Sequence, residues 1–283
     1  MSTLWVLALL AMMAAATQAL TVTSARIEHR AQDQARMNAD VNAAVIRTVL
    51  ALTDPRTDQR WPADGTLQSF VFDNRKMQIS IHDQTGLVDI NKANEATLNA
   101  LLQFAGADMG TAKTLTAAIM DWREPIGDAY PDRKTGTTDG QYVAAGLDYR
   151  PRHGPFQTVD ELKLVAGMTP DLFASLLPLV TVYSRTSDID QTVAPAAVLT
   201  LMANAAKAVQ PSAANAPGQP VPSSPAASAT PPPANDGPGF ARVAGRSFAV
   251  TITAVDGTRN VVRTIVVEPT GDNQRPYLVE AWQ

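Results

Sequence analysis

The spacing of apolar residues changes several times along the chain, and each change predicts a different kind of element. The first 52 residues contain no Pro or Gly, are uncharged from Leu4 to Val22, and then keep apolar residues at mostly helical spacing as far as Leu52. This pattern predicts one long helix, apolar at first and amphipathic afterwards. The 19 uncharged residues reach roughly 28 Å as a helix, close to the hydrocarbon thickness of a bilayer. We therefore expect a transmembrane segment over residues 1–25.

A cleaved secretory signal is the alternative interpretation of this N-terminal stretch. Small residues such as those at 14–16 and 17–19 would suit signal peptidase, but no positive charge precedes Leu4, as it would in a signal peptide. The absence of an interruption before Pro55 favours an uncleaved helix that continues into the rest of the protein.

Two regions far apart in the sequence carry the alternation expected of strands. After a turn-rich segment, apolar residues fall at mostly alternating positions, namely Phe70, Phe72, Met77, Ile79 and Ile81, with turn sites at Asp73-Asn74 and Thr85-Gly86. Near the C-terminus, "SFAVTITAVDGTRNVVRTIVVEP" alternates around Asp256-Gly257, and "YLVEAW" follows. This is the pattern of a hairpin and a final strand.

The region between these strands is predominantly helical. From Asn94 to Val180 several helical segments follow one another, and "APAAVLTLMANAAKAV" predicts another helix. Residues 211–238 contain nine of the 20 prolines and only one charge, which indicates a Pro/Ala-rich linker or disordered loop. We therefore predict an α+β fold in which a long N-terminal helix packs on an antiparallel sheet formed by residues 26–89 and 178–283, with an inserted all-α domain at 90–177.

Within the insertion, two segments have the form of helix-hairpin-helix units. In the first, Asn94 is a predicted N-cap, a hairpin spans Gly106 to Gly110, and a second helix starts near Thr111. In the second, Thr158 and Glu161 have capping-box spacing, Gly167 marks a turn, and a helix starts at Pro170.

Such units often bind phosphates of DNA, but the charges disfavour that use here. Residues 89–183 hold 12 acidic and 8 basic side chains, and Asp108 and Asp171 lie at the hairpins. A phosphate backbone would be repelled. The formal charge of the whole chain, -4, also fails to indicate a nucleic-acid partner.

Catalytic and redox chemistry find little support in the sequence. There is no Cys, which excludes disulfides and thiolate sites, and the three histidines are dispersed without zinc-site spacing. Neither a Gly-x-Ser-x-Gly elbow nor a phosphate-binding Gly loop occurs. Large aromatics such as Trp122 and Phe156 are better explained as packing anchors of the insertion. We expect a protein that is not an enzyme.

Six sequence blocks, in their order along the chain, resemble the K-type minor pseudopilins of the bacterial type II secretion system. They are "LWVLALLAMMAAA", "DQTGLVDINKANEATLNALL", "AAIMDWRE", "YVAAGLDYRPRHGPFQTVDELKLVAGMTPDLFASLLPLVTVYS", "APAAVLTLMA" and the C-terminal "SFAVTITAV...YLVEAW". The resemblance implies a pilin-like fold, a single pass through the inner membrane and a periplasmic location for most of the chain. It also implies a place at the tip of a short pseudopilus, which the protein would initiate or cap during export of folded proteins across the outer membrane. The implied partners are the I-type and J-type minor pseudopilins, the major pseudopilin and exported substrates, with no nucleic acid.

The resemblance further implies calcium in the inserted domain. The acidic loop "DWREPIGDAYPDRKTGTTD" offers Asp121, Asp128, Asp132 and Asp139, and Ca²⁺ prefers six to eight oxygen ligands of this kind. The family's Gly-Ala-Glu element appears here as Gly-Thr-Thr at 136–138, which removes one expected carboxylate. An ordinary solvated loop is the alternative. The alternatives for the whole protein are a membrane-anchored helix-hairpin-helix DNA-binding protein and an isolated periplasmic calcium-binding module.

Overall fold

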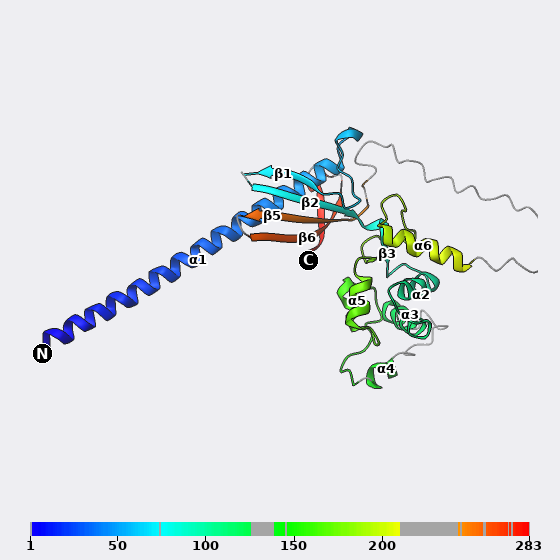
Figure 1. The fold of residues 1–283 in the computed structure, drawn as a ribbon, viewed down its shortest axis with the longest axis horizontal. Helices are drawn as coiled ribbons and strands as arrows, with labels where there is room; N and C mark the ends of the chain where they lie inside the picture. Colours follow the sequence, from blue (N-terminus) through cyan, green and yellow to red (C-terminus); the bar gives the residue numbers. More distant parts are fainter. Residues whose placement is uncertain are drawn as a thin grey trace, which may run out of the picture.

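The protein combines a long helix, an antiparallel sheet and a separate cluster of helices (Figure 1). The computed structural model describes residues 2–73, 75–125, 139–144, 146–209, 243, 245–256, 259–270, 272 and 274–282. The predicted linker at 211–238 therefore lies outside the described residues. The prediction of mixed helices and antiparallel strands is confirmed, with the strands on both sides of the helical block.

Helix α1 (Ser2–Leu52) crosses one face of the sheet with only its C-terminal part. Its buried positions Val41, Ala44, Val45 and Leu52 pack against strand residues such as Ile252. The three- and four-residue spacing of these positions places them on one face of the helix. Residues before Met37 are not part of this core among the residues described, so the N-terminal part of α1 projects away from the sheet (Figure 1).

The predicted transmembrane segment, residues 1–25, lies within this projecting part of α1. The side chains at 14–27 are outside those described. Within the part of the chain that the structure describes, no helix has both the length and the apolarity needed to cross a bilayer.

The sheet has five strands in the order β1-β2-β5-β6-β7, and every neighbouring pair is antiparallel. Its central pair, β2 and β5, joins the two distant strand regions, with Ile79 opposite Ile252. The strands and a short 3₁₀ helix in the segment before them have these bounds: η1 (Thr57–Gln59), β1 (Gln68–Phe72), β2 (Arg75–Asp83), β5 (Phe248–Asp256), β6 (Arg259–Pro269) and β7 (Tyr277–Trp282). The turn residues Asn74 and Gly257 lie outside the described residues.

The helical block lies between β2 and β5 and contains a small parallel sheet of two strands, which the sequence pattern did not predict. Val88 of β3 pairs with Val180 of β4. The elements of the block have these bounds: η2 (Gln84–Gly86), β3 (Val88–Asp89), α2 (Glu95–Phe104), α3 (Met109–Arg123), α4 (Asp139–Ala144), η3 (Val159–Leu164), α5 (Pro170–Leu176), β4 (Val180–Thr181) and α6 (Ala196–Val209).

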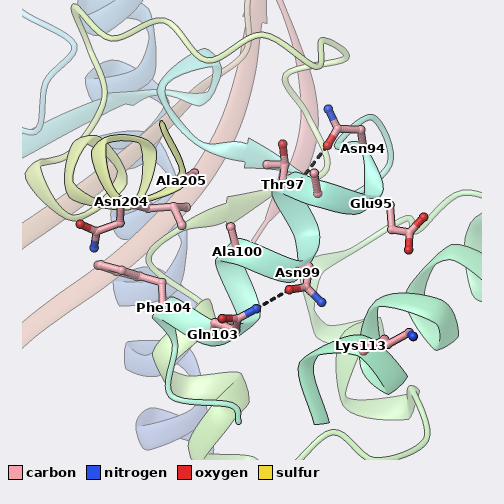
Figure 2. Close-up of a pocket in the computed structure, with 12 residues that line it drawn as sticks. Asn94, Glu95, Thr97, Asn99, Ala100, Gln103, Phe104, Lys113, Asn204 and Ala205 are labelled. Carbon is pink, nitrogen blue, oxygen red and sulfur yellow. Dashed lines mark hydrogen bonds between the residues drawn. The ribbon is translucent and has the colours of Figure 1, made fainter. Parts of the chain in front are cut away.

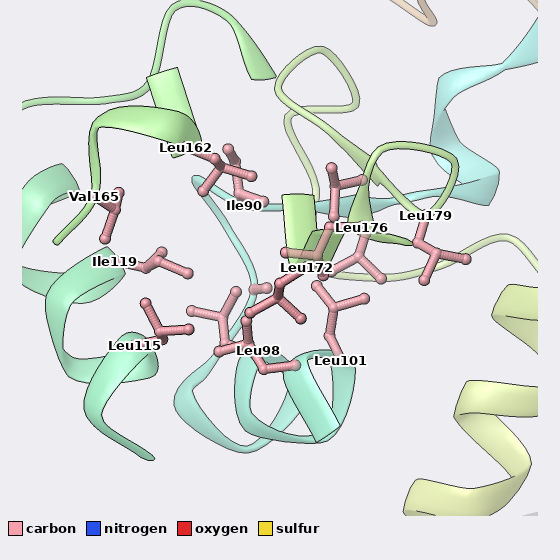
Figure 3. Packing of buried hydrophobic residues seen from close by; sticks show 14 of the residues in the cluster. Ile90, Leu98, Leu101, Leu115, Ile119, Leu162, Val165, Leu172, Leu176 and Leu179 are labelled. Carbon is pink, nitrogen blue, oxygen red and sulfur yellow. The ribbon is translucent and has the colours of Figure 1, made fainter. Parts of the chain in front are cut away.

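A second hydrophobic core fills the helical block (Figure 3). Leu98 and Leu101 of α2 face Leu115 and Ile119 of α3, with Leu172 of α5 between them. Burying a leucine side chain contributes roughly 1.5–3 kcal/mol, so this cluster can fold the block around its own centre. None of its described buried members comes from the five-stranded sheet.

Most predicted helix starts are confirmed. Asn94 caps α2 by accepting a hydrogen bond from the Thr97 amide at 2.8 Å, and α5 starts at Pro170 behind the N-cap Thr169. The capping box predicted at Thr158 and Glu161 is wrong. Residues 159–164 form a 3₁₀ helix, and the Thr158 side chain makes no capping hydrogen bond. Glu161 instead accepts from the amide of Gln157 at 3.0 Å, one residue earlier than the box requires.

Candidate assembly surface and metal loop

The predicted metal loop begins at the C-terminal end of α3 and ends at the start of α4. Asp121 lies in the last turn of α3 and is half-buried, and Asp139 is the first residue of α4. Asp128 and Asp132 lie outside the described residues, as does the side chain of Asp139. Among the side chains described, no three acidic or histidine residues come together to hold a metal ion. The calcium ligand set therefore stays a prediction.

The end of α3 is tied to the segment that follows α4. The imidazole Nδ1 of His153 lies 3.1 Å from the main-chain oxygen of Asp121 and 4.0 Å from its carboxylate. The next residue, Gly154, donates its amide to the oxygen of Trp122 at 2.9 Å. His153 adopts a left-handed backbone with φ 52°, which non-glycine residues adopt only where surrounding contacts hold them. His153 thus has a structural contact at the base of the loop.

Aromatic side chains pack together next to the two described ends of this loop. The rings of Trp122 and Phe156 stack with centroids 5.9 Å apart, and Tyr142 of α4 contacts Trp122 at 6.3 Å. Trp122 and Phe156 are each 3% exposed, which confirms that they are packing anchors. The Tyr142 hydroxyl accepts a hydrogen bond from the Ala166 amide at 3.0 Å. The short helix α4 is thereby fixed to the core although most of the preceding loop is not described.

The two hairpins of the insertion face one another across a small cavity of about 280 Å³. Gly106 and Gly167 turn their hairpins with φ of 110° and 91°. Asp108 and Asp171 both line the cavity. The Asp108 carboxylate accepts from the amides of Gly110 and Thr111 and from the Thr111 hydroxyl, and these bonds hold its pKa below the usual value. The hairpin that would meet a phosphate thus presents a fixed negative charge.

A wider groove of about 1180 Å³ runs between α2 and α6 (Figure 2). Alanines and one partly exposed aromatic, Phe104, form its apolar wall, and Leu201 and Ala205 of α6 face them. The carboxamides of Asn99 and Gln103 lie along its rim and hydrogen-bond to each other (Figure 2). No pattern in the sequence indicates this groove, because α2 and α6 are about 100 residues apart.

Helix α1 offers two different surfaces over its C-terminal part. On its inner side, Val41 and Val45 face the sheet and are 3% and 2% exposed. Ile46 and Leu50 lie one helical turn apart on the outer side and are 47% and 60% exposed. The outer stripe was missed because Ile46 and Leu50 fit the same helical spacing as the buried set.

One ion pair inside the sheet domain connects α1 to β2. The Arg75 guanidinium lies 2.6 Å from the carboxylate of Asp40, whose side chain is 5% exposed. Asp40 occupies a position on the sheet-facing side of α1, between Met37 and Val41. A carboxylate there is tolerated because the arginine of the neighbouring strand neutralises it.

Two arginines connect the insertion to the sheet. Arg185, just after β4, contacts Glu268 of β6 at 3.1 Å and also pairs with Glu280 of β7. Arg246, just before β5, lies 2.8 Å from the carboxylates of both Asp83 and Asp190. We call these two sets of contacts the arginine clamps.

Buried polar groups support each clamp. Asp89 of β3 is 3% exposed and accepts from the Arg185 amide at 2.8 Å and from the Ser184 hydroxyl at 3.1 Å. Asp83 is also buried, and burial raises its pKa despite the opposing effects of Arg246 and Thr85. The orientation of the insertion is thus held by charged groups at its two ends.

The fold and these surfaces can be compared with known proteins. Residues 76–185 match the family model described as type II secretion system protein K. Two relatives, both named type II secretion system protein K, are 28% identical to the chain, over 201 residues in Klebsiella pneumoniae and over 137 residues in Pectobacterium carotovorum subsp. carotovorum. The chain is thus similar to protein K of the type II secretion system over these residues.

The two alignments cover different shares of this chain and of the relatives. The alignments cover 62% and 43% of this chain, and 60% and 40% of the Klebsiella and Pectobacterium proteins. The structure also resembles a chain in the crystal structure of the GspK-GspI-GspJ complex from the type 2 secretion system of enterotoxigenic Escherichia coli. The TM-score is 0.57 at 14% identity, over 90% of this chain and 98% of the other. The shared architecture therefore includes nearly all of that chain.

Proposed function

We propose that the chain is a non-enzymatic minor pseudopilin that assembles with I-type and J-type minor pseudopilins. The observation that carries the proposal is the projecting helix α1, whose residues before Met37 contribute to neither described core. A helix of this length without partners gains little from propensity alone and needs other surfaces to pack against. The fold similarity to a chain of a GspK-GspI-GspJ complex supports helices of neighbouring pseudopilins as those surfaces.

The proposed location is the inner membrane, with the sheet and the insertion in the periplasm. The stretch from Leu4 to Val22 carries no charge, and the large apolar side chains described between Leu4 and Met13 are each more than half exposed. Exposed apolar surface of this kind is costly in water and favourable in lipid. This part of α1 would then be the single membrane anchor.

The proposed position in the pseudopilus is its tip. The insertion lies at the end of the molecule opposite the N-terminus of α1 (Figure 1). If α1 packs among the helices of a growing filament, the insertion becomes the body that ends it. A K-type subunit at this position would initiate or cap the pseudopilus during export of folded proteins across the outer membrane.

We also propose that the loop between α3 and α4 binds Ca²⁺ through Asp121, Asp128, Asp132 and Asp139. The carboxylates suit a hard cation, and bound Ca²⁺ would supply positive charge that holds this acidic loop in one arrangement. Trp122 follows Asp121 in the chain and stacks on Phe156. Ca²⁺ should therefore change tryptophan fluorescence in the wild type and not in a Trp122→Phe variant, with Mg²⁺ as the comparison cation.

The experiment that tests the assembly is size-exclusion chromatography with light scattering. The full chain in detergent is mixed with I-type and J-type pseudopilins, once with calcium and once with chelator. The proposal predicts a complex with one copy of each subunit. Ile46→Asp on the outer stripe of α1 should weaken it, whereas Met109→Asp, a 76% exposed position on the insertion, should not. A K-type chain that stays alone under both conditions would refute the proposal.

A further inference from the structure

The two edges of the five-stranded sheet differ in how they are protected. β1 and β7 are the edge strands. Any edge strand presents backbone N–H and C=O groups without a strand partner, and such a row readily pairs with another strand. Proteins commonly block this pairing with bulges, prolines or charged side chains. Comparing these devices on β1 and β7 shows which edge is free to bind.

The β7 edge has several such devices. Its register with β6 shifts between Val266 and Val267, which marks an irregularity of the bulge type. The residue left out of the pairing is Glu280, whose carboxylate is held by Arg185 of the adjoining arginine clamp. A bulge bends and twists the strand locally, so β7 does not offer a regular edge to a partner.

The β1 edge lacks these devices. Its five residues, QSFVF, contain neither charge nor Pro, and they pair with β2 in five consecutive positions without a shift. Leu67, Val71 and Phe72 are 64%, 66% and 41% exposed. β1 is therefore a regular, uncharged edge with apolar side chains beside it.

A neighbouring charge indicates what kind of strand would fit. Val71 lies opposite Lys76 of β2 in the register, and opposite residues share one face of a sheet. Lys76 is exposed and forms no ion pair with any residue that the structure describes. Its side chain is long enough to extend past Val71 toward a strand added beyond β1. A carboxylate on that added strand would complement it.

We propose that β1 accepts a strand from a neighbouring pseudopilin, which adds a sixth strand to the sheet. The added strand would place an apolar side chain against Val71 and a carboxylate toward Lys76. Main-chain hydrogen bonds would supply affinity, and these two side-chain contacts would set the register. The inference rests on the proposed function and identifies a contact separate from the packing of α1.

Hydrogen exchange of the full chain in detergent tests this, measured alone and in the complex with I-type and J-type pseudopilins. Amides within Gln68–Phe72 should exchange at least tenfold more slowly in the complex. Val71→Lys should weaken complex formation about tenfold, in the range of a central contact residue. Leu278→Lys on β7, where the native side chain is 47% exposed, is the matched control and should change the affinity less than twofold.

The outcomes separate the two proposals. A complex that forms with unchanged exchange in β1 and with full affinity for Val71→Lys would overturn the added strand and leave the proposed function intact. Absence of any complex with the wild-type chain would overturn both. Equal thermal unfolding of Val71→Lys and wild type shows that the loss of binding is not a loss of folding.

Discussion

The inserted helical domain and the sheet domain are stabilised by different kinds of buried contact. Between Ile90 and Leu179, the described buried residues are apolar with the exception of Thr116. The sheet domain and the junction bury Asp40, Asp83 and Asp89, each paired with an arginine or with hydrogen-bond donors from another segment. The described core of the insertion is almost wholly apolar, whereas the sheet and junction combine an apolar core with buried carboxyl groups held by partners from other segments.

This difference has a physical consequence for the proposed tip. Apolar packing is little affected by salt, while contacts between partly exposed charges weaken as salt is added. The insertion should therefore keep its internal structure under conditions that loosen its attachment to the sheet. Substitutions in the two regions can test this separation.

The largest expected loss is within the insertion. Trp122→Ala removes the ring that stacks on Phe156 and contacts Tyr142, and a buried Trp→Ala change costs about 4 kcal/mol of unfolding free energy. Urea unfolding followed by circular dichroism measures the loss. Leu177→Ala, at a 52% exposed position, is the control and should cost less than about 1 kcal/mol. Equal effects of the two changes would contradict the assigned core.

The next loss is expected in the sheet domain. Arg75→Ala leaves the carboxylate of Asp40, 5% exposed, without its partner, and an uncompensated buried charge costs about 3 kcal/mol. The double variant Arg75→Ala and Asp40→Ala should lose less than the sum of the single changes. A double-mutant cycle on urea midpoints measures this coupling. Additive effects would show that the pair does not stabilise the fold.

A smaller effect is expected at the arginine clamps. Arg185 is 57% exposed, so Arg185→Ala should cost only about 1 kcal/mol after allowance for solvent screening. The informative measurement is limited proteolysis at low and at 0.5 M salt, which should release the insertion faster from the variant and from wild type at high salt. Arg56→Ala, which breaks a local pair with Asp54, should leave the proteolysis rate unchanged.

The smallest effect concerns pH at the second clamp. Burial raises the pKa of Asp83 in the folded chain, so the folded chain binds this proton more tightly than the unfolded chain does. The stabilisation that protonated Asp83 provides is fully present below about pH 3.9, the ordinary pKa of an aspartic acid in the unfolded chain. It is lost as the pH rises through the pKa of Asp83 in the folded chain. Relative to Asp83→Asn, the wild type should thus lose stability from pH 4 upward. Thermal unfolding of both proteins across pH 4–7 gives this difference, and parallel curves would contradict it.

Local features of the fold were the easiest to predict from the sequence. The Asn94 cap, the turn at Gly167, the helix at Pro170 and the alternation around Ile79 depend on residues close together in the chain. Their spacing therefore contains the necessary information. Thr158 shows the limit of this reasoning, because a capping-box spacing was present but the backbone formed a 3₁₀ helix.

Contacts between distant residues could not be predicted in the same way. Nothing in the sequence near Asp40 or Arg246 indicates that Arg75 and Asp190 are their partners. The first pair forms only when α1 packs on the sheet, and the second only when the insertion meets the sheet. The parallel pairing of β3 with β4 also joins residues about 90 positions apart. Asp121 and Asp139 lie at the two ends of their loop, and all four candidate metal ligands, Asp121, Asp128, Asp132 and Asp139, stay a prediction.

The parallel pair β3 and β4 has a consequence for how this protein can be rebuilt. Because Val88 lies beside Val180, the chain leaves the sheet domain and returns to it at nearly one place. Domains whose two ends are close together tolerate transfer into other hosts. Residues 90–179 thus form a cassette that could be exchanged between K-type chains from different bacteria. Such chimaeras would show whether residues 90–179 or the sheet domain determine which proteins are exported under the proposed function.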